Sequence, residues 1–282
     1  MTTVKSGAHP VRDAFDLTGR VAIITGGAGL LGRQHAEAIA EMGGIPVIVD
    51  IRDAAAKDVA SGIADRHKNR ALAVAADITD HASVTRLLEQ VLATFGRVDI
   101  LINNAANDPK VGDRNTAWSR LEVFPIDVWE RDISVGLTGA LICSQVIGTH
   151  MAEAGAGVIL NIASDLALIG PDQRIYEQPG RAPKEQPVKP VSYPVVKAGL
   201  VGLTRYLATY WSHRGVRVNA ISPGGVEDNN DAQFVAKLTN LIPLGRMAKA
   251  DEYKAAVVFL VSDASAYMTG ANLVIDGGRT AW

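Results

Sequence analysis

The sequence predicts an α/β fold, in which helices cover both faces of one doubly wound parallel sheet in a single domain. Short runs rich in β-branched residues alternate with longer stretches of helical periodicity, which is typical of parallel strands joined by crossover helices. Apolar runs such as Val21–Thr25 and Val98–Asn103 suit strands that are buried on both faces. With 48% hydrophobic and 21% charged residues among 282, the chain can form a packed core.

The periodicity places these elements along nearly the whole chain. The expected strands are Val21–Thr25, Pro46–Asp50, Ala71–Ala75, Val98–Asn103, Val158–Ile162, Val216–Ile221 and Leu273–Ile275. The expected helices are Leu30–Met42, Asp53–Lys68, His81–Phe95, Ile126–Met151, Tyr193–His213 and Asp251–Val261. Gly43 and Gly96 fall just past helix ends, where left-handed C-caps are expected.

The remaining segments are expected to be irregular. Residues 1–16 are interpreted as a solvated N-terminal arm, which leaves 17–282 as the domain. The segment 107–125, an insertion at 169–191 and a substrate loop at 223–249 all follow strand ends. Ligands of open α/β sheets bind beyond the carboxyl ends of the strands, so these segments are expected to form the substrate side.

Charge and composition favour a small-molecule ligand. Lysine plus arginine number 28 against 30 aspartates plus glutamates, which does not favour nucleic acid or a membrane surface as partner. Cys143 is the only cysteine, which excludes an internal disulfide, and the six histidines show no metal-binding spacing, so no metal is expected. Without an apolar stretch of spanning length or a signal-peptide pattern, a cytoplasmic protein is expected.

A glycine-rich turn follows the first strand. Gly27, Gly29 and Gly32 match G-x-G-x-x-G, whose glycines allow a tight turn, close approach of a pyrophosphate and close packing of helix on strand. Amides at the start of the following helix can then hold the phosphate. The context of strand, turn and helix predicts a Rossmann-type dinucleotide site rather than a simple turn. The residues expected to contact the cofactor here are Gly26, Gly27, Gly29, Leu30, Leu31 and Gly32.

An acidic residue ends the second strand. Asp50 lies about 20 residues beyond the glycines, where a carboxylate accepts hydrogen bonds from the adenosine ribose and repels a 2′-phosphate. NAD is therefore expected rather than NADP, although Arg52 nearby leaves room for a phosphate.

Tyr193-Pro194-Val195-Val196-Lys197 carries the chemical prediction. The spacing of four places the phenol and the ammonium on one helix face, and Pro194 favours a position in the first helical turn. The lysine charge and the positive end of the helix dipole both favour the phenolate, which lowers the tyrosine pKa and makes a general acid or base. A surface pair is the alternative reading of Tyr193 and Lys197 alone.

Other motifs accompany this pentapeptide. They are Asn103-Asn104-Ala105-Ala106, Asn161-Ile162-Ala163-Ser164 and Ser222-Pro223-Gly224-Gly225, each at a strand end. Together with the glycine turn, this set spans Thr25 to Gly278 and resembles the short-chain dehydrogenase/reductase family.

The resemblance implies a role for each matching residue. Tyr193 would be the acid/base, Lys197 would also hold the nicotinamide ribose, and Ser164 would hydrogen-bond the reacting oxygen, where two hydroxyls stabilise developing charge. The further cofactor contacts it implies are Ile51, Asp77, Ile78, Asn103, Ala105, Pro223, Gly224 and Val226. A homodimer or homotetramer is expected on the same ground.

The sequence departs from the family in its glycine pattern and at two further places. Gly136 stands where the family usually carries an Asn that links the lysine to solvent through water. Ser134, Thr138 or a water could complete this proton relay, or proton exchange could be slower. Alternatively, the glycine could serve close helix packing at a subunit interface. Ser164 and Tyr193 are 29 positions apart, more than is typical. The insertion between them could offer Arg174 or Lys189 to an anionic substrate group, with solvated surface charge as the alternative. Trp118 could line a lid, with core-edge packing as the alternative.

The predicted function is NAD-dependent interconversion of a secondary alcohol and a ketone. The region 165–197 together with 136–140 is similar to family members found with bacterial surface-sugar and flagellin-glycan genes, which implies a sugar-derived substrate. Two other functions remain open: an NAD-binding protein with little or no catalysis, and a lyase or epimerase that uses bound NAD transiently.

Overall fold

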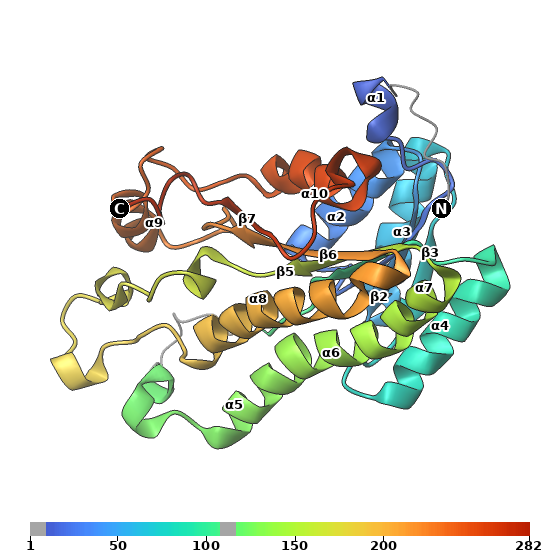
Figure 1. Ribbon diagram of the computed structural model, residues 1–282. Coiled ribbons are helices and arrows are strands. Elements are labelled where there is room, and N and C mark those ends of the chain that lie inside the picture. The colour runs from blue at the N-terminus through green and yellow to red at the C-terminus, as the bar shows by residue number, and fades with distance from the viewer. Residues whose placement is uncertain (1–9, 108–116) are drawn as a thin grey trace.

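Seven parallel strands form one sheet in the order β3-β2-β1-β4-β5-β6-β7, with helices on both faces (Figure 1). This computed structural model describes residues 10–107 and 117–282. The strands are β1 Val21–Thr25, β2 Ile45–Asp50, β3 Leu72–Ala75, β4 Ile100–Asn103, β5 Gly157–Ile162, β6 Val216–Pro223 and β7 Asn272–Ile275. Strand order reverses between β1 and β4, which is the position where open α/β sheets bind their ligands.

The helices occupy the segments between these strands. They are α1 Val11–Ala14, α2 Leu30–Glu41, α3 Asp53–His67, α4 His81–Phe95, α5 Ile126–Ile133, α6 Gly139–Cys143, α7 Thr149–Ala154, α8 Ser192–Trp211, α9 Ala232–Thr239 and α10 Lys254–Val261. The predicted doubly wound α/β fold is thus confirmed, and β1 has the predicted bounds. α5, α6 and α7 form one continuous helical segment that is widened by π-helical turns at Ser134–Thr138 and Ser144–Gly148.

Each face of the sheet has its own hydrophobic core. Ile24, Ile48 and Ile102 point to the face that α2, α3 and α10 cover, whereas their neighbours Ile23 and Leu101 point to the face covered by α4, α8 and the α5–α7 segment. Successive side chains of a strand point to opposite faces of the sheet, and helices cover both faces. Each central strand is therefore apolar on both faces. The core therefore fixes the strand register and, with it, the positions of the strand ends.

The α5–α7 segment, Ile126–Ala154, is 29 residues long and apolar enough to meet the length and composition of a membrane span. In the fold it packs on the sheet, where Cys143, Ile147 and Met151 are fully buried in the core. Burial raises the pKa of the Cys143 thiol to about 12, so this cysteine is a packing residue and not a nucleophile.

Two helices lie in segments for which the sequence predicts no regular structure. Within the predicted arm 1–16, α1 is followed by Phe15, whose ring packs 6.4 Å from that of Phe259; residues 1–9 are outside the described part. Within the substrate loop 223–249, α9 begins at a cap in which Asp231 accepts hydrogen bonds from two backbone amides. The insertion 169–191 contains only short 3-10 turns.

Gly136 lies where the α5–α7 segment crosses α8. A Cβ added at Gly136 would lie 2.6 Å from Cγ1 of Val196, closer than real atoms pack. The space that an Asn side chain would take is therefore filled by Val196 of the same chain. This contact within the chain accounts for the glycine without any subunit interface.

We predict that Gly136→Ala lowers the free energy of unfolding. The added methyl overpacks the contact with Val196 at a cost of roughly 1–3 kcal/mol, more than the gain of about 1 kcal/mol expected for removing a helical glycine. Urea denaturation of Gly136→Ala, Val196→Ala and the double variant should reveal a coupling of about 1 kcal/mol or more. Gly202 of α8 is a matched control with no atom within 4 Å of its added Cβ, and Gly202→Ala should stabilise. Additive effects at 136 and 196 would contradict the packing argument.

Candidate active site

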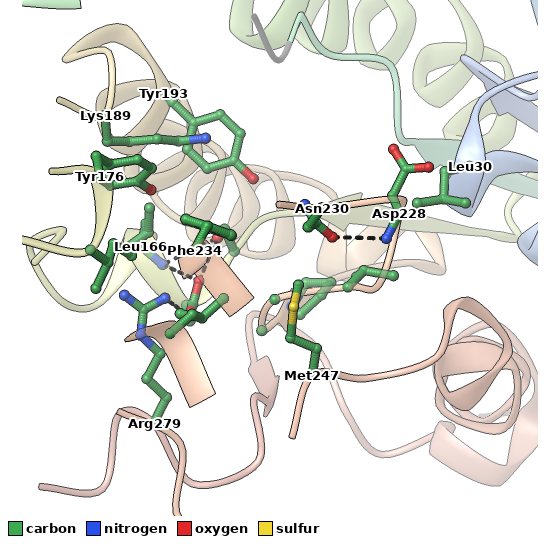
Figure 2. Close-up of a pocket in the computed structure, with 18 of the residues that line it drawn as sticks. Leu30, Leu166, Tyr176, Lys189, Tyr193, Asp228, Asn230, Phe234, Met247 and Arg279 are labelled. Carbon is green, nitrogen blue, oxygen red and sulfur yellow. Dashed lines mark hydrogen bonds and ion pairs between the residues drawn. The ribbon is translucent and has the colours of Figure 1, made fainter. Parts of the chain in front are cut away.

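A cavity of about 990 Å³ opens at the carboxyl ends of the strands (Figure 2). Its wall combines residues from the start of α2 just after the glycine turn, from the ends of β4, β5 and β6, from the start of α8, from the insertion 169–191 and from α9. The predicted catalytic residues Ser164, Tyr193 and Lys197 all line it. The predicted cofactor residues on its wall are Leu30, Leu31, Pro223, Gly224 and Val226.

The glycine turn has the geometry of a phosphate cradle. Gly26 has a φ of +60°, and a Cβ there would lie 2.9 Å from the Cα of Ala105. A Cβ at Gly32 would lie 2.2 Å from the carbonyl oxygen of Gly26, so only glycine lets α2 approach the turn this closely. α2 begins after Gly29, which has no side chain to satisfy the first amides of the helix. Those amides are therefore available to an anion.

The ends of β1 and β4 are joined by hydrogen bonds at this turn. The Thr25 hydroxyl accepts from the backbone N–H groups of Asn104 and Ala105, at 3.0 and 3.1 Å. In return, Nδ2 of Asn104 donates to the carbonyl oxygens of Thr25 and Gly26, at 2.9 and 3.1 Å. The glycine turn is thus fixed to the neighbouring strand end.

Asn103 differs from its predicted role as a cofactor-lining residue. Its side chain is buried, and Nδ2 donates to Asn161 at 2.9 Å and to Ser144 at 3.3 Å. Asn104 and Ala106 line the cavity in place of Asn103 and Ala105. Adjacent side chains in an extended chain point to opposite faces, which explains why Asn104 and not Asn103 faces the cavity. Cofactor contacts of Asn103 and Ala105 stay predictions.

Asp50 is positioned between the second strand end and the glycine turn. Its buried carboxylate accepts hydrogen bonds from the backbone N–H of Ala28 at 3.3 Å and from the backbone N–H and Nε of Arg52, both at 3.1 Å. The Arg52 guanidinium is exposed, and its pKa is raised because it bonds this carboxylate. The adjacent Ile51 side chain is 72% exposed.

Asp77 and Ile78 follow β3 and lie away from the cavity wall. The exposed Asp77 carboxylate accepts from the backbone and hydroxyl of Thr79, at 2.9 and 2.7 Å. Ile78 is buried and touches the helix at Gly139, where an added Cβ would lie 2.7 Å from it. Asp77 is thus held in a local turn, and Ile78 packs in the core.

Tyr193 and Lys197 lie in the first two turns of α8, as their spacing predicts. The buried Lys197 ammonium donates to the carbonyl oxygen of Ile162 at 2.8 Å and lies 5.7 Å from the centre of the Tyr193 ring. α8 begins at Ser192, whose hydroxyl donates to the buried Asp132 at 2.5 Å and ties the start of α8 to α5. The Tyr193 ring therefore belongs to the first turn of α8 and lies near the Lys197 ammonium.

Lys189 of the insertion adds a second positive charge beside the phenol. Its ammonium lies 3.8 Å from the centre of the Tyr193 ring, and Figure 2 shows its side chain extended along that ring. The backbone N–H of Lys189 donates to the Gln173 side chain at 2.9 Å, which positions this part of the insertion. The insertion thus reaches the candidate catalytic group.

Arg174 and Trp118, the predicted substrate residues, lie outside the cavity wall. The Arg174 side chain is 80% exposed and makes an ion pair with Asp172 at 2.6 Å, which raises the pKa of Arg174 and lowers that of Asp172. The Trp118 ring packs 5.9 Å from that of Phe124. Arg174 thus takes part in a surface charge pair and Trp118 in an aromatic contact, and their substrate roles stay predictions.

Ser164 follows β5 and is buried beside an ion pair. Its hydroxyl donates to Oδ1 of Asp165 at 2.8 Å, and its oxygen accepts from the backbone N–H of Leu166 at 3.2 Å. Oδ2 of Asp165 accepts from Nη1 of Arg279 at 2.7 Å. Both members of this pair are less than 10% exposed and line the cavity.

The insertion and the substrate loop meet over an apolar part of the wall. The rings of Tyr176 and Phe234 lie 5.6 Å apart, and the Lys237 ammonium donates to the Glu177 carbonyl oxygen at 2.6 Å. Behind them Ile175, Leu238, Ile242 and Met247 form a small core of their own. The α9 side of the cavity therefore combines the apolar Phe234, Leu238 and Met247 with polar residues that lie just before and at the start of α9: Asp228, Asn229, Asn230, Asp231 and Gln233.

Sequence reasoning missed the contributions of Asp165, Arg279, Asn104 and α9 to the site. Asn104 belonged to a motif already singled out, and an Asp231 cap followed by Phe234 and Leu238 at a spacing of four is a helix signal. The Asp165–Arg279 pair joins residues 114 positions apart, for which local patterns give no signal.

Among the described residues, one group has ligand atoms close enough to hold a metal: Glu37, Glu41 and His67. It lies outside the cavity wall. Glu37 bonds Arg66 and His67, which hold its pKa at about 2, and Glu41 bonds Lys254 at 2.7 Å. Ion pairs account for this cluster.

Comparison with known proteins assigns the family. Residues 20–176 match the family model described as short chain dehydrogenase, and residues 182–280 match the one described as Enoyl-(Acyl carrier protein) reductase. The chain is 37% identical to D-threitol dehydrogenase of Mycolicibacterium smegmatis, over 94% of this chain and 95% of that protein. It is 33% identical to NAD-dependent glycerol dehydrogenase of Listeria innocua, over 94% and 96%.

A solved structure agrees over the same length. The gluconate 5-dehydrogenase from Burkholderia cenocepacia, in complex with NADP and tartrate, matches with a TM-score of 0.84 and 29% identity, over 97% of this chain and 100% of that one. The family models, these relatives and the solved structure each match most of the chain or a large part of it. The chain is therefore an oxidoreductase that belongs to the short-chain dehydrogenase family.

Proposed function

We propose that this enzyme interconverts a secondary alcohol and a ketone of a small polyol or sugar-derived substrate, with NAD as cofactor and Tyr193 as general acid/base. The observation that carries this proposal is the convergence of Ser164, Tyr193 and Lys197 on one cavity that also adjoins the glycine turn. Hydride transfer to or from a nicotinamide requires the catalytic side chains and the cofactor site to open into the same cavity.

The residues of the glycine turn fit a dinucleotide. Gly26 and Gly32 leave no room for a side chain beside the helix start, and the amides after Gly29 provide an anion site for the pyrophosphate. Pro223 and Gly224 at the end of β6 would face the nicotinamide amide. When bound, the cofactor accepts or donates the hydride.

Tyr193 moves the proton in this proposal. In alcohol oxidation the phenolate accepts the hydroxyl proton of the substrate, and in ketone reduction the phenol returns it. The buried Lys197 ammonium and the start of α8 both favour the phenolate. Ser164 donates a hydrogen bond to the reacting oxygen, which stabilises negative charge there.

Asp50 supports NAD over NADP. Its carboxylate lies at the end of β2 and already bonds the glycine turn, where it would accept the ribose hydroxyls and repel a 2′-phosphate. The relatives divide on this point, since the glycerol dehydrogenase is named as NAD-dependent and the gluconate dehydrogenase contains NADP. The choice therefore rests on Asp50 and Arg52 of this chain.

The substrate class rests on the relatives and on the mixed cavity wall. The relatives named above act on threitol, glycerol and gluconate, which are small polyhydroxylated molecules. None of these names supports the surface-glycan association, so a free polyol or aldonate is the proposed class. A cytoplasmic homodimer or homotetramer without nucleic-acid or membrane partners completes the proposal.

A complete set of Ser164, Tyr193 and Lys197 side chains supports catalysis over a cofactor-binding role alone. A lyase or epimerase that uses NAD transiently would release no reduced cofactor. Stoichiometric appearance of NADH with a polyol substrate separates this function from both rivals.

We predict that Tyr193→Phe lowers kcat about 10²–10⁴-fold, because general acid–base catalysis contributes factors of this size. Cofactor affinity, measured by NADH fluorescence titration, should stay within about twofold because the phenol is not part of the proposed phosphate or ribose contacts. Tyr206 is a matched control: it is 62% exposed on the same helix, and Tyr206→Phe should leave kcat unchanged. Substantial turnover by Tyr193→Phe would remove Tyr193 as the proton carrier.

We predict that Asp50→Ala shifts selectivity toward NADP. Loss of the carboxylate removes the ribose acceptor and releases Arg52 for the 2′-phosphate, so the NAD to NADP ratio of kcat/KM should fall about tenfold or more, which corresponds to about 1.4 kcal/mol. Asp53, which pairs with Lys57 in the first turn of α3, is the control, and Asp53→Ala should not change the ratio. An unchanged ratio in Asp50→Ala would contradict the ribose role.

A further inference from the structure

A buried chain of polar contacts runs from the C-terminal segment to the candidate catalytic serine. Arg279 donates to Oδ2 of Asp165 at 2.7 Å, and Oδ1 of the same carboxylate accepts the Ser164 hydroxyl at 2.8 Å. Oδ1 also accepts the backbone N–H of Leu166 at 2.8 Å. The residues linked by these hydrogen bonds, Arg279, Asp165, Ser164 and Leu166, are each at most 7% exposed.

The turn after β7 directs Arg279 into the cavity. Gly277 and Gly278 have φ of +68° and +90°, a conformation that side chains rarely adopt. Asp276 accepts from the backbone N–H groups of Gly278 and Thr280, at 2.9 and 2.7 Å, which closes the turn. The guanidinium then enters the cavity wall below Leu166 in Figure 2.

The Ser164 hydroxyl has a single proton to donate. In the structure this proton is directed to Asp165, whereas the proposed reaction requires it at the substrate oxygen. A buried carboxylate without a counter-charge would hold the hydroxyl strongly, because charged acceptors form the stronger hydrogen bonds. The Arg279 guanidinium on the other carboxylate oxygen partly neutralises the negative charge of Asp165, which weakens the hydrogen bond that Asp165 accepts from Ser164.

We propose that Arg279 is a positioning residue that acts on Ser164 through Asp165 and lets the serine hydroxyl turn to the reacting oxygen. This inference rests on the proposed function of Ser164. It adds to that function a residue from the far end of the chain.

A double-mutant cycle tests the proposal. Arg279→Met should lower kcat, normalised to the concentration of cofactor-binding sites, about tenfold. KM and NADH affinity should stay within about twofold of the wild-type values, because the lost interaction matters in the transition state. In a Ser164→Ala background, Arg279→Met should change kcat less than about twofold, because no hydroxyl is left to position. Additive effects of the two substitutions on kcat would overturn the proposal.

Two further variants separate positioning from folding. Arg279→Met leaves the Asp165 charge buried and unpaired, which destabilises the fold, whereas Asp165→Asn/Arg279→Met removes both charges and should recover most of kcat. Arg279→Lys keeps the counter-charge and should retain most of kcat as well. A well-folded Asp165→Asn/Arg279→Met enzyme as slow as Arg279→Met alone would also overturn the proposal.

The remaining outcomes distinguish this proposal from its rivals. Arg131, which pairs with Asp127 on the surface at 3.1 Å, is a matched control, and Arg131→Met should leave kcat unchanged. If Arg279→Met raises KM for an aldonate but not for a neutral polyol and spares kcat, Arg279 binds substrate directly and the positioning role is overturned. If Ser164→Ala turns over at the wild-type rate, the proposed function of Ser164 fails first, and the positioning role fails with it.

Discussion

The candidate site depends on the hydrogen bonds between Thr25 and Asn104. They join the ends of β1 and β4 where strand order reverses, and the same Asn104 side chain reaches the carbonyl oxygen of Gly26. The glycine turn is thereby fixed against the neighbouring strand, and the start of α2 is aimed at the cavity. Because all strands are parallel, Ser164 at the end of β5 and Pro223 at the end of β6 lie on the same edge.

The sequence was informative wherever function follows from local pattern. The strands, the glycine turn, Asp50 and the Tyr193 to Lys197 spacing depend on hydrophobic period and short motifs, and the structure places each where the pattern predicts. At the end of β4 the motif alone does not show which of two adjacent amides faces the cavity: Asn104 lines it, whereas the Asn103 side chain is buried. Arg174 in the proline-rich insertion and Trp118 in the segment before α5 lie outside the cavity wall, and the paths of both segments depend on tertiary contacts that local patterns do not show.

Those tertiary contacts explain how the insertion reaches Tyr193. Arg120 donates to the carbonyl oxygen of Pro183 at 3.1 Å, and Ser119 accepts from the backbone of Val188 at 3.1 Å, so the insertion is held against the segment before α5. Lys189 then lies over the Tyr193 ring. The contacts of Arg120 and Ser119 have no sequence signal, since each joins residues more than 60 positions apart.

Gly136 shows that a departure from a family pattern can be a packing adjustment. The Asn that usually links the lysine to solvent has no room beside Val196, so this chain has exchanged a polar side chain for contact between two helices. Lys197 nevertheless remains buried and bonded to the Ile162 carbonyl oxygen. In the proposed mechanism, the electrostatic support that Lys197 gives to Tyr193 is therefore independent of the missing Asn. The missing Asn would affect only the route by which the proton reaches water, which would use groups other than a side chain at position 136.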